Sequence, residues 1–421
     1  MIAPLSPREQ DRLAQLRDEG QPAEARRAQA ILMTYEGRDA GAIAAAIQVS
    51  KSTVWRWRRA WQRDRLGLFA PPGDEASSGD LPSATGPDQA PAPIPGVTAP
   101  RLPLELRETV GVLPDDPLAE AGRKVLLYHF ERMLLHEPGT RLGEDIEALH
   151  DMRVATRRMR SAFRLFKFAY TPKAIRPFRD ELRAIGGSLG AVRDLDVALD
   201  KAWRYAGEHH GADLSALLTL WETRRSEARD HLIAELESKR FARFVKHFDR
   251  FLRTPAAGAA PQPAPDSPAP REVRHVAPVL IAGHYAQVRA YEPVVAGAPV
   301  ATLHALRIEF KRLRYTLEFF EEVLGPEAKR VIKEIKRMQD HLGDLHDADV
   351  AALEIAALLD EHEAAYSGTP GFARPDLGGV YDYLAAQVQE RQRLQDAFPD
   401  AWASFLDEGL RRDLALAVAA L

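Results

Sequence analysis

The sequence predicts an all-α protein built from an N-terminal helix-turn-helix, a Pro-rich linker and a duplicated pair of four-helix bundles. Three observations predict this class. The hydrophobic periodicity is helical almost throughout, and helix-forming residues such as Leu, Ala, Arg and Glu dominate. Two low-complexity segments divide the chain, and one charged helical motif occurs twice, 154 residues apart.

The composition sets limits on the class of protein. The chain has 421 residues, of which 45% are hydrophobic and 28% charged, as in soluble globular proteins. The net charge of -4 means that any basic site is a local concentration. The absence of cysteine excludes disulfides, thiolate metal sites and a cysteine nucleophile, and it fits a reducing cytoplasm. We expect neither a secretory signal nor a membrane span, because no suitable apolar run occurs.

The low-complexity segments define the expected domains. Residues 1–70 carry 12 Lys or Arg against 8 Asp or Glu, and the segment that follows holds eight prolines in residues 71–100 without one basic residue. Such a segment cannot bury a core and is predicted to be a disordered, semi-extended linker. The predicted domains are 1–70, a linker at 71–102, and a duplicated domain at 103–410 with bundles at 103–253 and 271–410 and a second linker at 254–270.

The two bundles repeat each other in sequence. The stretch "LHDMRVATRRMRSAFRLF" at 149–166 aligns with "LHALRIEFKRLRYTLEFF" at 303–320. Further along, "LGAVRDLDV" at 189–197 aligns with "LGDLHDADV" at 342–350. A repeat of this length indicates duplication of one bundle.

Each copy of the first motif places a basic face beside an apolar face. At 100° per residue, the first basic face spans an arc of about 80°. Its members are His150, Arg153, Arg157 and Arg160, and their counterparts are His304, Arg307, Lys311 and Arg314. Arg158 and Arg312 fall on a different side of the wheel and rank lower, and Arg164 is the least secure because its counterpart is Glu318.

A basic face of this kind has two explanations. It can be solvated or neutralised by carboxylates of neighbouring helices, or it can bind an anion. Two faces in the same register, each short of local acids, favour the anion, because clustered like charges destabilise a helix. Arginine is suited to phosphate, since its planar guanidinium donates two hydrogen bonds to one group.

These motifs resemble the CHAD family, the conserved histidine α-helical domain, over about residues 103–410. The resemblance implies two pseudo-symmetric four-helix bundles with a basic groove that binds inorganic polyphosphate, association with polyphosphate granules, and no cofactor. The residues that it implies for binding are the eight named above together with Arg183, Arg193, Lys333, Lys336 and Arg337.

Enzymatic alternatives are weaker on sequence grounds. "ELESK" at 235–239 matches the ExExK signature of triphosphate tunnel enzymes, but that chemistry needs a strand and the surrounding pattern is helical. The acidic pairs Asp194/Asp196 and Asp347/Asp349 could hold a divalent cation, although such residues more often cap helices or pair with arginines. We therefore predict a non-enzymatic protein without a metal. The alternatives are a polyphosphate-sensing DNA-binding regulator and an enzyme of polyphosphate or phosphoester metabolism.

The N-terminal unit has the pattern helix, tight turn, helix over 37–61. Val54, Trp57 and Trp61 are spaced to pack, and Ser50 can cap the second helix. The unit resembles helix-turn-helix domains of transposases and bacterial regulators, which implies binding of double-stranded DNA with the second helix in the major groove. The alternative is a module that binds protein or dimerises. The residues predicted to face DNA are Lys51, Ser52, Thr53, Arg56 and Arg59. DNA binding would tether polyphosphate granules to the nucleoid.

Overall fold

The computed structural model confirms the all-α class. It describes residues 5–38, 40–47, 49, 54, 57–58, 61, 65–69, 106–143, 146–209, 212–261, 271–367 and 376–421. The chain forms an N-terminal unit within 1–99 and a helical domain that comprises 100–141 and 149–421. Within the described ranges there is no β-strand, only two isolated bridges. None of the helices in these ranges is long and apolar enough to cross a membrane.

The N-terminal unit consists of short helices around two small cores. The elements are α1 (Pro7–Glu19), α2 (Pro22–Tyr35), α3 (Ala40–Ala46) and the 3-10 helix η1 (Arg65–Phe69). Val54 and Trp61 are buried and Trp57 is half-buried between the cores, as their spacing predicts. The five residues predicted to face DNA lie outside the part of the chain that the structure describes.

An ion pair joins α1 to η1 in this unit. Arg65 donates two hydrogen bonds of 2.6 Å to Glu9, which also completes a capping box with Ser6 at the start of α1. These hydrogen bonds, from Arg65 first and then from Ser6, lower the pKa of Glu9 to about 2.

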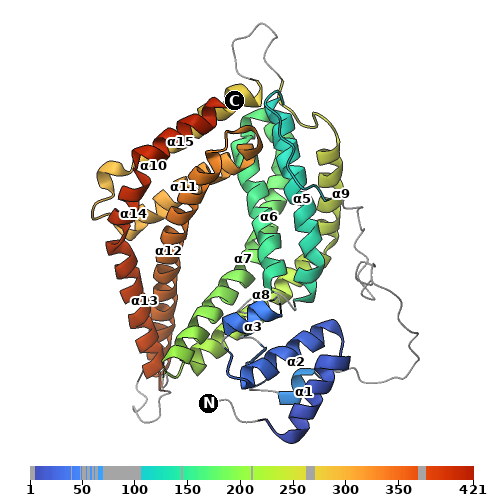
Figure 1. Ribbon diagram of the computed structural model, residues 1–421, viewed down its shortest axis with the longest axis vertical. Coiled ribbons are helices and arrows are strands. Elements are labelled where there is room, and N and C mark those ends of the chain that lie inside the picture. Colours follow the sequence, from blue (N-terminus) through green and yellow to red (C-terminus); the bar gives the residue numbers. More distant parts are fainter. Residues whose placement is uncertain are drawn as a thin grey trace, which may run out of the picture. The chain divides into compact units, whose positions relative to one another are not determined.

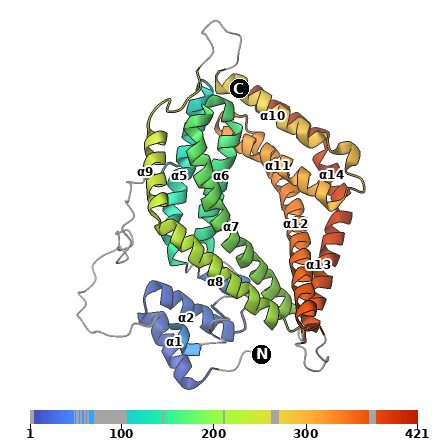
Figure 2. The same cartoon turned by 180° about the vertical axis from the view of Figure 1, so that it is seen from behind.

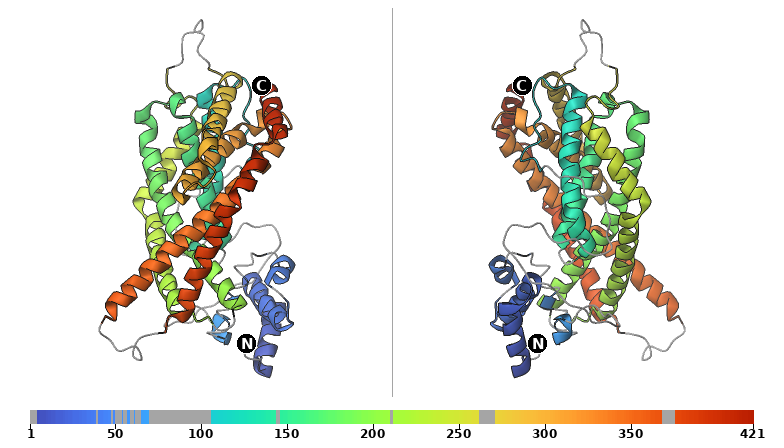
Figure 3. Two further views of the ribbon diagram at one scale, coloured as in Figure 1. Left: turned by 90° about the vertical axis from the view of Figure 1, so that its left-hand side faces the viewer. Right: turned by 90° about the vertical axis from the view of Figure 1, so that its right-hand side faces the viewer.

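The helical domain consists of two halves with matching helices (Figures 1 and 2). The first half contains α5 (Leu118–Leu142), α6 (Ile146–Leu165), α7 (Pro172–Glu208), α8 (Ser215–Glu237) and α9 (Lys239–Arg253). The second half contains α10 (Val273–Arg289), α11 (Val300–Phe320), α12 (Ala328–Ala365), α13 (Gly378–Asp396), α14 (Phe398–Phe405) and α15 (Glu408–Ala419). In the side views one half lies in front of the other (Figure 3).

The predicted duplication appears as four equivalent helical segments in each half. Helix α6 corresponds to α11, and each follows one helix and precedes a long one. The fourth segment is broken into consecutive helices in both halves, α8 and α9 in the first and α13 to α15 in the second. In the first half the break falls at Ser238, whose hydroxyl caps α9 by accepting a hydrogen bond from the N–H of Phe241.

Two apolar contacts join the halves, one at each end of the long helices. We call the first the aromatic joint: Phe166 of the first half packs against Phe319 and Phe320 of the second, with ring centroids 6.4 and 5.8 Å apart. We call the second the distal joint. It is one buried cluster contributed by the last turns of α7 and α12 and by their neighbours α8 and α13, and it includes Leu199, Trp221, Ile355 and Tyr383.

Backbone hydrogen bonds also join the two halves near the starts of α5 and α10. Leu118 N–H donates to the carbonyl of Arg271, and Val273 N–H donates to the carbonyl of Asp116, both at 3.0 Å. The carboxylate of Glu322 accepts from the backbone N–H groups of residues 110–112 at 2.6 to 2.9 Å. The segment before α5 therefore belongs structurally to both halves.

The second predicted linker is shorter than its composition suggests. Residues 254–261 form turns, with Gly258 accepting from Thr171 N–H at 2.8 Å and Ala260 N–H donating to Ala169 at 2.8 Å. Gly258 has φ +66°, and a Cβ there would lie 2.7 Å from the Cβ of Ala174, so glycine is required. Residues 262–270 and the first linker, 71–102, lie outside the described residues.

A substitution at Gly122 tests how tightly the aromatic joint is packed. A Cβ on Gly122 of α5 would lie 2.9 Å from a ring carbon of Phe166 and from the Tyr170 hydroxyl. We expect Gly122→Ala to lower the free energy of unfolding by about 1–3 kcal/mol, through overpacking. The matched control is Gly187→Ala in α7, where a Cβ meets nothing within 4 Å. It should instead stabilise by up to about 1 kcal/mol through helix propensity. Thermal unfolding measures both, and equal shifts would contradict the close packing at Gly122.

Candidate anion-binding site

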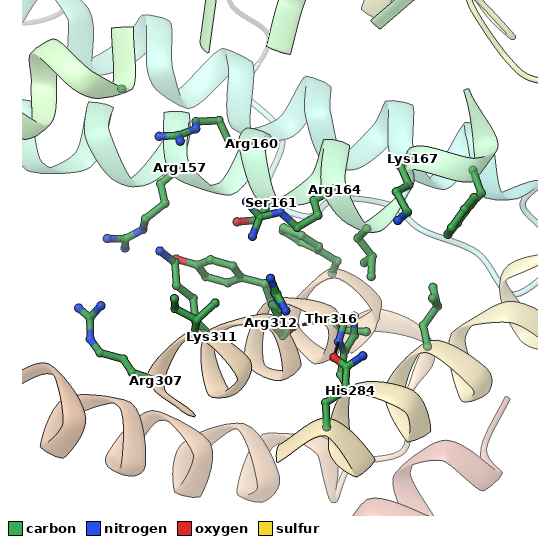
Figure 4. Close-up of a pocket in the computed structure, with 18 of the residues that line it drawn as sticks. Arg157, Arg160, Ser161, Arg164, Lys167, His284, Arg307, Lys311, Arg312 and Thr316 are labelled. Atoms are coloured by element: carbon green, nitrogen blue, oxygen red, sulfur yellow. Dashed lines mark hydrogen bonds between the residues drawn. The ribbon is translucent and has the colours of Figure 1, made fainter. Parts of the chain in front are cut away.

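A pocket of the helical domain lies between α6 and α11, with α10 closing one side (Figure 4). Its volume is about 670 Å³. Among the described residues, eight basic residues and no acidic residue line it. Helix α6 supplies Arg153, Arg157, Arg160 and Arg164, the following 3-10 helix η2 (Lys167–Ala169) supplies Lys167, and α11 supplies Arg307, Lys311 and Arg312.

The two faces of α6 explain how these cations come to the pocket. Met152, Met159, Phe163 and Phe166 are fully buried in the core of the first half. The basic arc adjoins this apolar face on the helical wheel, so packing of the apolar face aims the arginines toward α11. Helix α11 repeats the arrangement, with Leu303, Leu306, Phe310 and Leu313 buried in its own half.

Few of the lining cations are neutralised. Arg153 pairs with Asp194 of α7 at 3.0 Å, and Arg312 pairs with Glu309 at 2.6 Å. No described carboxylate forms an ion pair with the other five cations of the two helices. These five are Arg157, Arg160, Arg164, Arg307 and Lys311. The Nε of Arg157 is buried and has no hydrogen-bond partner among the described residues. A buried donor of this kind requires an acceptor, which a bound anion would supply.

Burial and mutual repulsion perturb the titration of these groups. Burial, followed by the charges of Arg157, Arg307 and other nearby arginines, lowers the pKa of Lys311 to about 7. The same two causes lower the pKa of Arg160, where Arg183 contributes the largest repulsion, and of Arg164. The pocket is therefore an environment in which positive charge is unfavourable and an anion would be favourable.

The structure brings five of the predicted anion-binding residues together in the pocket: Arg153, Arg157, Arg160, Arg307 and Lys311. His150 does not line it; burial first, and then the charges of Arg193 and of the lining residues Arg157 and Arg153, lower the pKa of His150. His304 forms a hydrogen bond of 3.0 Å with His346 and lies 3.8 Å from Asp349. The two motif histidines and Arg193 are thus neighbours of the lining and are not part of it.

Several candidates lie elsewhere, contrary to the sequence-based expectation. Arg314 does not line the pocket, because it lies 3.7 Å from Glu318 and 5.1 Å from the ring of Tyr315. Arg183 is 68% exposed, lies 3.7 Å from Asp180 and does not line the pocket. Lys333, Lys336 and Arg337 are exposed on α12 and line no part of the pocket.

Sequence reasoning also missed part of the lining. Arg164 and Arg312 line the pocket although they ranked below the other motif arginines, and His284 of α10 and Lys167 were not predicted. The signal for Arg164 was present, because it continues the spacing of three and four residues that begins at His150. Its counterpart Glu318 concealed it, since the two halves are not equivalent here.

The pseudo-symmetric partner of the pocket has the opposite charge. A second cavity lies between the elements that correspond, in the other half, to those around the first pocket. Its lining comes from α5, α6, α11, the 3-10 helix η4 (Glu321–Val323) and α12. At an offset of 154 residues, Glu318 replaces Arg164, Glu321 replaces Lys167 and Glu322 replaces Phe168. Glu318 pairs with Arg158 at 2.9 Å, and Glu322 holds residues 110–112. One side of the duplicated site has thus become an internal contact.

The acidic motifs do not assemble a further site. Asp196 pairs with Arg225 at 2.5 Å, Asp347 with Lys201 at 3.1 Å and Asp349 with Arg391 at 3.0 Å. Among the residues that the structure describes, no group of three or more His, Cys, Asp or Glu side chains could hold a metal ion. The "ELESK" segment spans the junction of α8 and α9, so its carboxylates do not share a strand face.

The sequence and this geometry agree with known families. The CHAD domain family matches residues 124–356, more than half of the chain, and the protein belongs to this family. A homeodomain-like helix-turn-helix family matches residues 21–68.

Individual relatives are distant. The sequence of this chain is 27% identical over 266 residues to that of an uncharacterized protein, MT2285, of Mycobacterium tuberculosis. That match covers 57% of this chain and 46% of the relative, so the chain spans about half the length of the curated relatives it matches. The crystal structure of the CHAD domain from the plant Ricinus communis is 26% identical with a TM-score of 0.55, covering 70% of this chain and 95% of that one. PptA from Streptomyces chartreusis shares the fold, at 18% identity and a TM-score of 0.50 over 68% of this chain and all of that one.

Removing the charge of Lys311 tests how much the repulsion among the pocket cations lowers the free energy of unfolding. The folded-state pKa of about 7 lies below the ordinary value of 10.5, so the folded protein binds fewer protons between these limits and its stability rises with pH there. We expect Lys311→Met to increase the free energy of unfolding by about 1 kcal/mol at pH 6, because the side chain is only half-buried. The advantage should shrink above pH 7. Denaturant unfolding at pH 6 and 9 checks this, with exposed Lys333→Met as control; destabilisation by Lys311→Met at pH 6 would contradict it.

Proposed function

We propose that the helical domain binds inorganic polyphosphate in the pocket between α6 and α11. The observation that carries this proposal is the lining of eight basic residues without an acidic one, five of them without a carboxylate partner among the described residues. Membership of the CHAD family supports the same ligand, because the family resemblance of the repeated motifs implies polyphosphate.

The spacing of the cations suits a linear polyanion. Arg153, Arg157, Arg160 and Arg164 place roughly one guanidinium on each turn of α6, about 5.4 Å apart along the helix axis. Each arginine can donate two hydrogen bonds to one phosphate. Polyphosphate repeats one charged group along a chain without bases, so repeated contacts of moderate strength add up, and counterion release makes the affinity salt-dependent, by analogy with nucleic acids.

We further propose that binding occurs without turnover. Two carboxylates form ion pairs with lining residues, Asp194 with Arg153 and Glu309 with Arg312. General acid–base chemistry needs a carboxylate or histidine positioned against a nucleophile, and the described residues of the lining offer no such pair. Release of orthophosphate from polyphosphate in the presence of a divalent metal would overturn this part of the proposal.

A second activity, DNA binding, is favoured by the N-terminal unit. The homeodomain-like match covers the residues predicted to face DNA, and Val54 and Trp61 are buried as a helix-turn-helix requires. A chain with both activities would tether polyphosphate granules to DNA and to the nucleoid. It could equally act as a regulator whose DNA binding responds to polyphosphate.

Neutralising two pocket arginines tests the polyphosphate site. We expect Arg157→Ala/Arg307→Ala to weaken polyphosphate binding at least about tenfold, because two charge-assisted contacts are lost. The slope of log affinity against log salt should become shallower by about one to two. The matched control is Lys333→Ala/Lys336→Ala, which removes the same charge from exposed positions on α12. Equal effects of the two double variants would refute the assignment of the pocket.

Two arginines of the predicted second helix test the DNA activity. We expect Arg56→Ala/Arg59→Ala to reduce binding of duplex DNA about tenfold or more, because phosphate contacts supply most of the affinity. Polyphosphate affinity should stay unchanged in the same variant. Fluorescence anisotropy with each ligand separates the two activities. Unchanged DNA binding would assign the N-terminal unit to another partner.

A further inference from the structure

Helix α9 concentrates positive charge on the outside of the first half. Its fifteen residues include six Lys or Arg and a single acidic residue, Asp249, in a protein whose overall net charge is -4. The helix lies beside α5 and follows α8 (Figures 1 and 2). None of its residues lines the pocket between α6 and α11. The pocket therefore does not account for this charge.

The charges of α9 form one face. Lys239, Arg243, Lys246 and Arg250 fall within an arc of about 60° and extend about 16 Å along the helix. All four are exposed. The opposite face is buried in the core of the first half through Phe241, Phe244, Val245, Phe248 and Leu252. Because packing already uses the apolar face, only the charged face is available to a partner.

This face is largely free of neutralising acids. Arg240 pairs with Glu181 of α7 at 2.7 Å, and Arg253 pairs with Asp249 at 2.8 Å, both at the margins of the face. The four central residues form no ion pair with a carboxylate in the described part of the chain. The guanidinium of Arg243 donates only to the backbone carbonyl of Lys239, at 3.2 Å.

The corresponding region of the second half does not share this charge. The last helix there, α15, balances Arg411 and Arg412 with Glu408 and Asp413, and Asp413 also pairs with Arg330 at 2.8 Å. The basic face of α9 is therefore not a general consequence of the bundle fold. It occurs in the half that also provides most of the pocket's cations.

Helix α7 connects the basic face of α9 with the pocket. Arg183 of α7 repels Arg160 in the pocket, and Arg179 likewise repels Arg164, so that each lowers the pKa of its neighbour. On its other side, α7 contacts α9 through the pair of Glu181 with Arg240. Asp180 of α7 lies 3.7 Å from Arg183 and 3.8 Å from Arg176. The four exposed basic residues of this part of α7, Lys173, Arg176, Arg179 and Arg183, nevertheless outnumber Asp180 and Glu181, so a net positive charge continues from the pocket over α7 to α9.

We propose that the outer face of α9, with Arg179 and Arg183 of α7, is a second binding surface for linear polyphosphate and holds the part of a long chain that extends beyond the pocket. This inference rests on the proposed function of the pocket. Once a segment occupies the pocket, the next segment reaches α9 at a high effective concentration, so weak contacts there increase the affinity. A chain short enough to fit within the pocket gains nothing from α9. Continuity with the pocket favours this polymer over DNA as the occupant.

The test compares short and long ligands on the full chain. The α9 variant is Lys246→Ala/Arg250→Ala, which preserves helix propensity on an exposed face. The matched control is Arg411→Ala/Arg412→Ala on α15, which removes the same charge. The ligands are tripolyphosphate and long-chain polyphosphate, with duplex DNA in parallel. We expect the α9 variant to lose about three- to tenfold in affinity for the long chain, with its tripolyphosphate affinity unchanged. The control should match the wild type for every ligand.

The outcomes separate this inference from the function of the pocket. Equal long-chain affinity of the wild type and the α9 variant overturns the inference and leaves the pocket standing. A loss of DNA affinity alone in the α9 variant also overturns it and assigns the surface to nucleic acid. A loss of long-chain affinity in the α9 variant, with Arg157→Ala/Arg307→Ala unaffected, overturns the pocket and with it the inference, because α9 would then bind the polymer alone. Unchanged thermal unfolding of both α9 and α15 variants verifies that the comparison is between folded proteins.

Discussion

The structure depends on holding two basic helices, α6 and α11, face to face against their mutual repulsion. Arg157 and Lys311 lie on opposite walls of one pocket without an ion-pair partner among the described residues. The opposing free energy comes from the aromatic joint and the distal joint, which fix the helices at both ends of the domain. Each aromatic side chain that is fully buried there contributes about 2–3 kcal/mol relative to exposure. Apolar packing at the ends therefore makes an unneutralised charge cluster possible in the middle.

Duplication provided this arrangement, and divergence made it one-sided. Two equivalent cavities are expected from two equivalent halves, but Glu318 stands where the first half has Arg164. That single difference gives Arg158 an internal partner at 2.9 Å and brings Arg314 within 3.7 Å of the same carboxylate. The acidic side thus became part of the contact between the halves, while the basic side kept its charge. The pocket and the contact that stabilises it descend from the same duplicated surface.

The fold and five of the eight basic lining residues could be predicted from the sequence, for a definite reason. The helical periodicity and the internal sequence repeat determine which residues share a face of α6 or α11. Arg153, Arg157 and Arg307 could therefore be found from the helical wheel. The wheel gives a direction around one helix and says nothing about the depth or the neighbours of a side chain. Arg314 was misplaced because Glu318 and Tyr315 hold it, and Arg312 was undervalued because α10 turns that side of α11 into a pocket wall. Comparing the repeats identified the common positions and obscured those at which the halves differ.

The pocket cations without a carboxylate partner link anion binding to the protonation of Lys311 and to the free energy of unfolding. Lys311 has a pKa of about 7 because burial and then the neighbouring arginines disfavour its charged form. The negative charge of a polyanion in the pocket would offset the arginines and stabilise the ammonium form of Lys311 against its burial. Its binding must therefore draw protons onto Lys311 above pH 7 and strengthen the fold, because the repulsion between α6 and α11 is relieved. A site built from internally satisfied ion pairs would show neither coupling, because each cation would lose one carboxylate as it gained a phosphate.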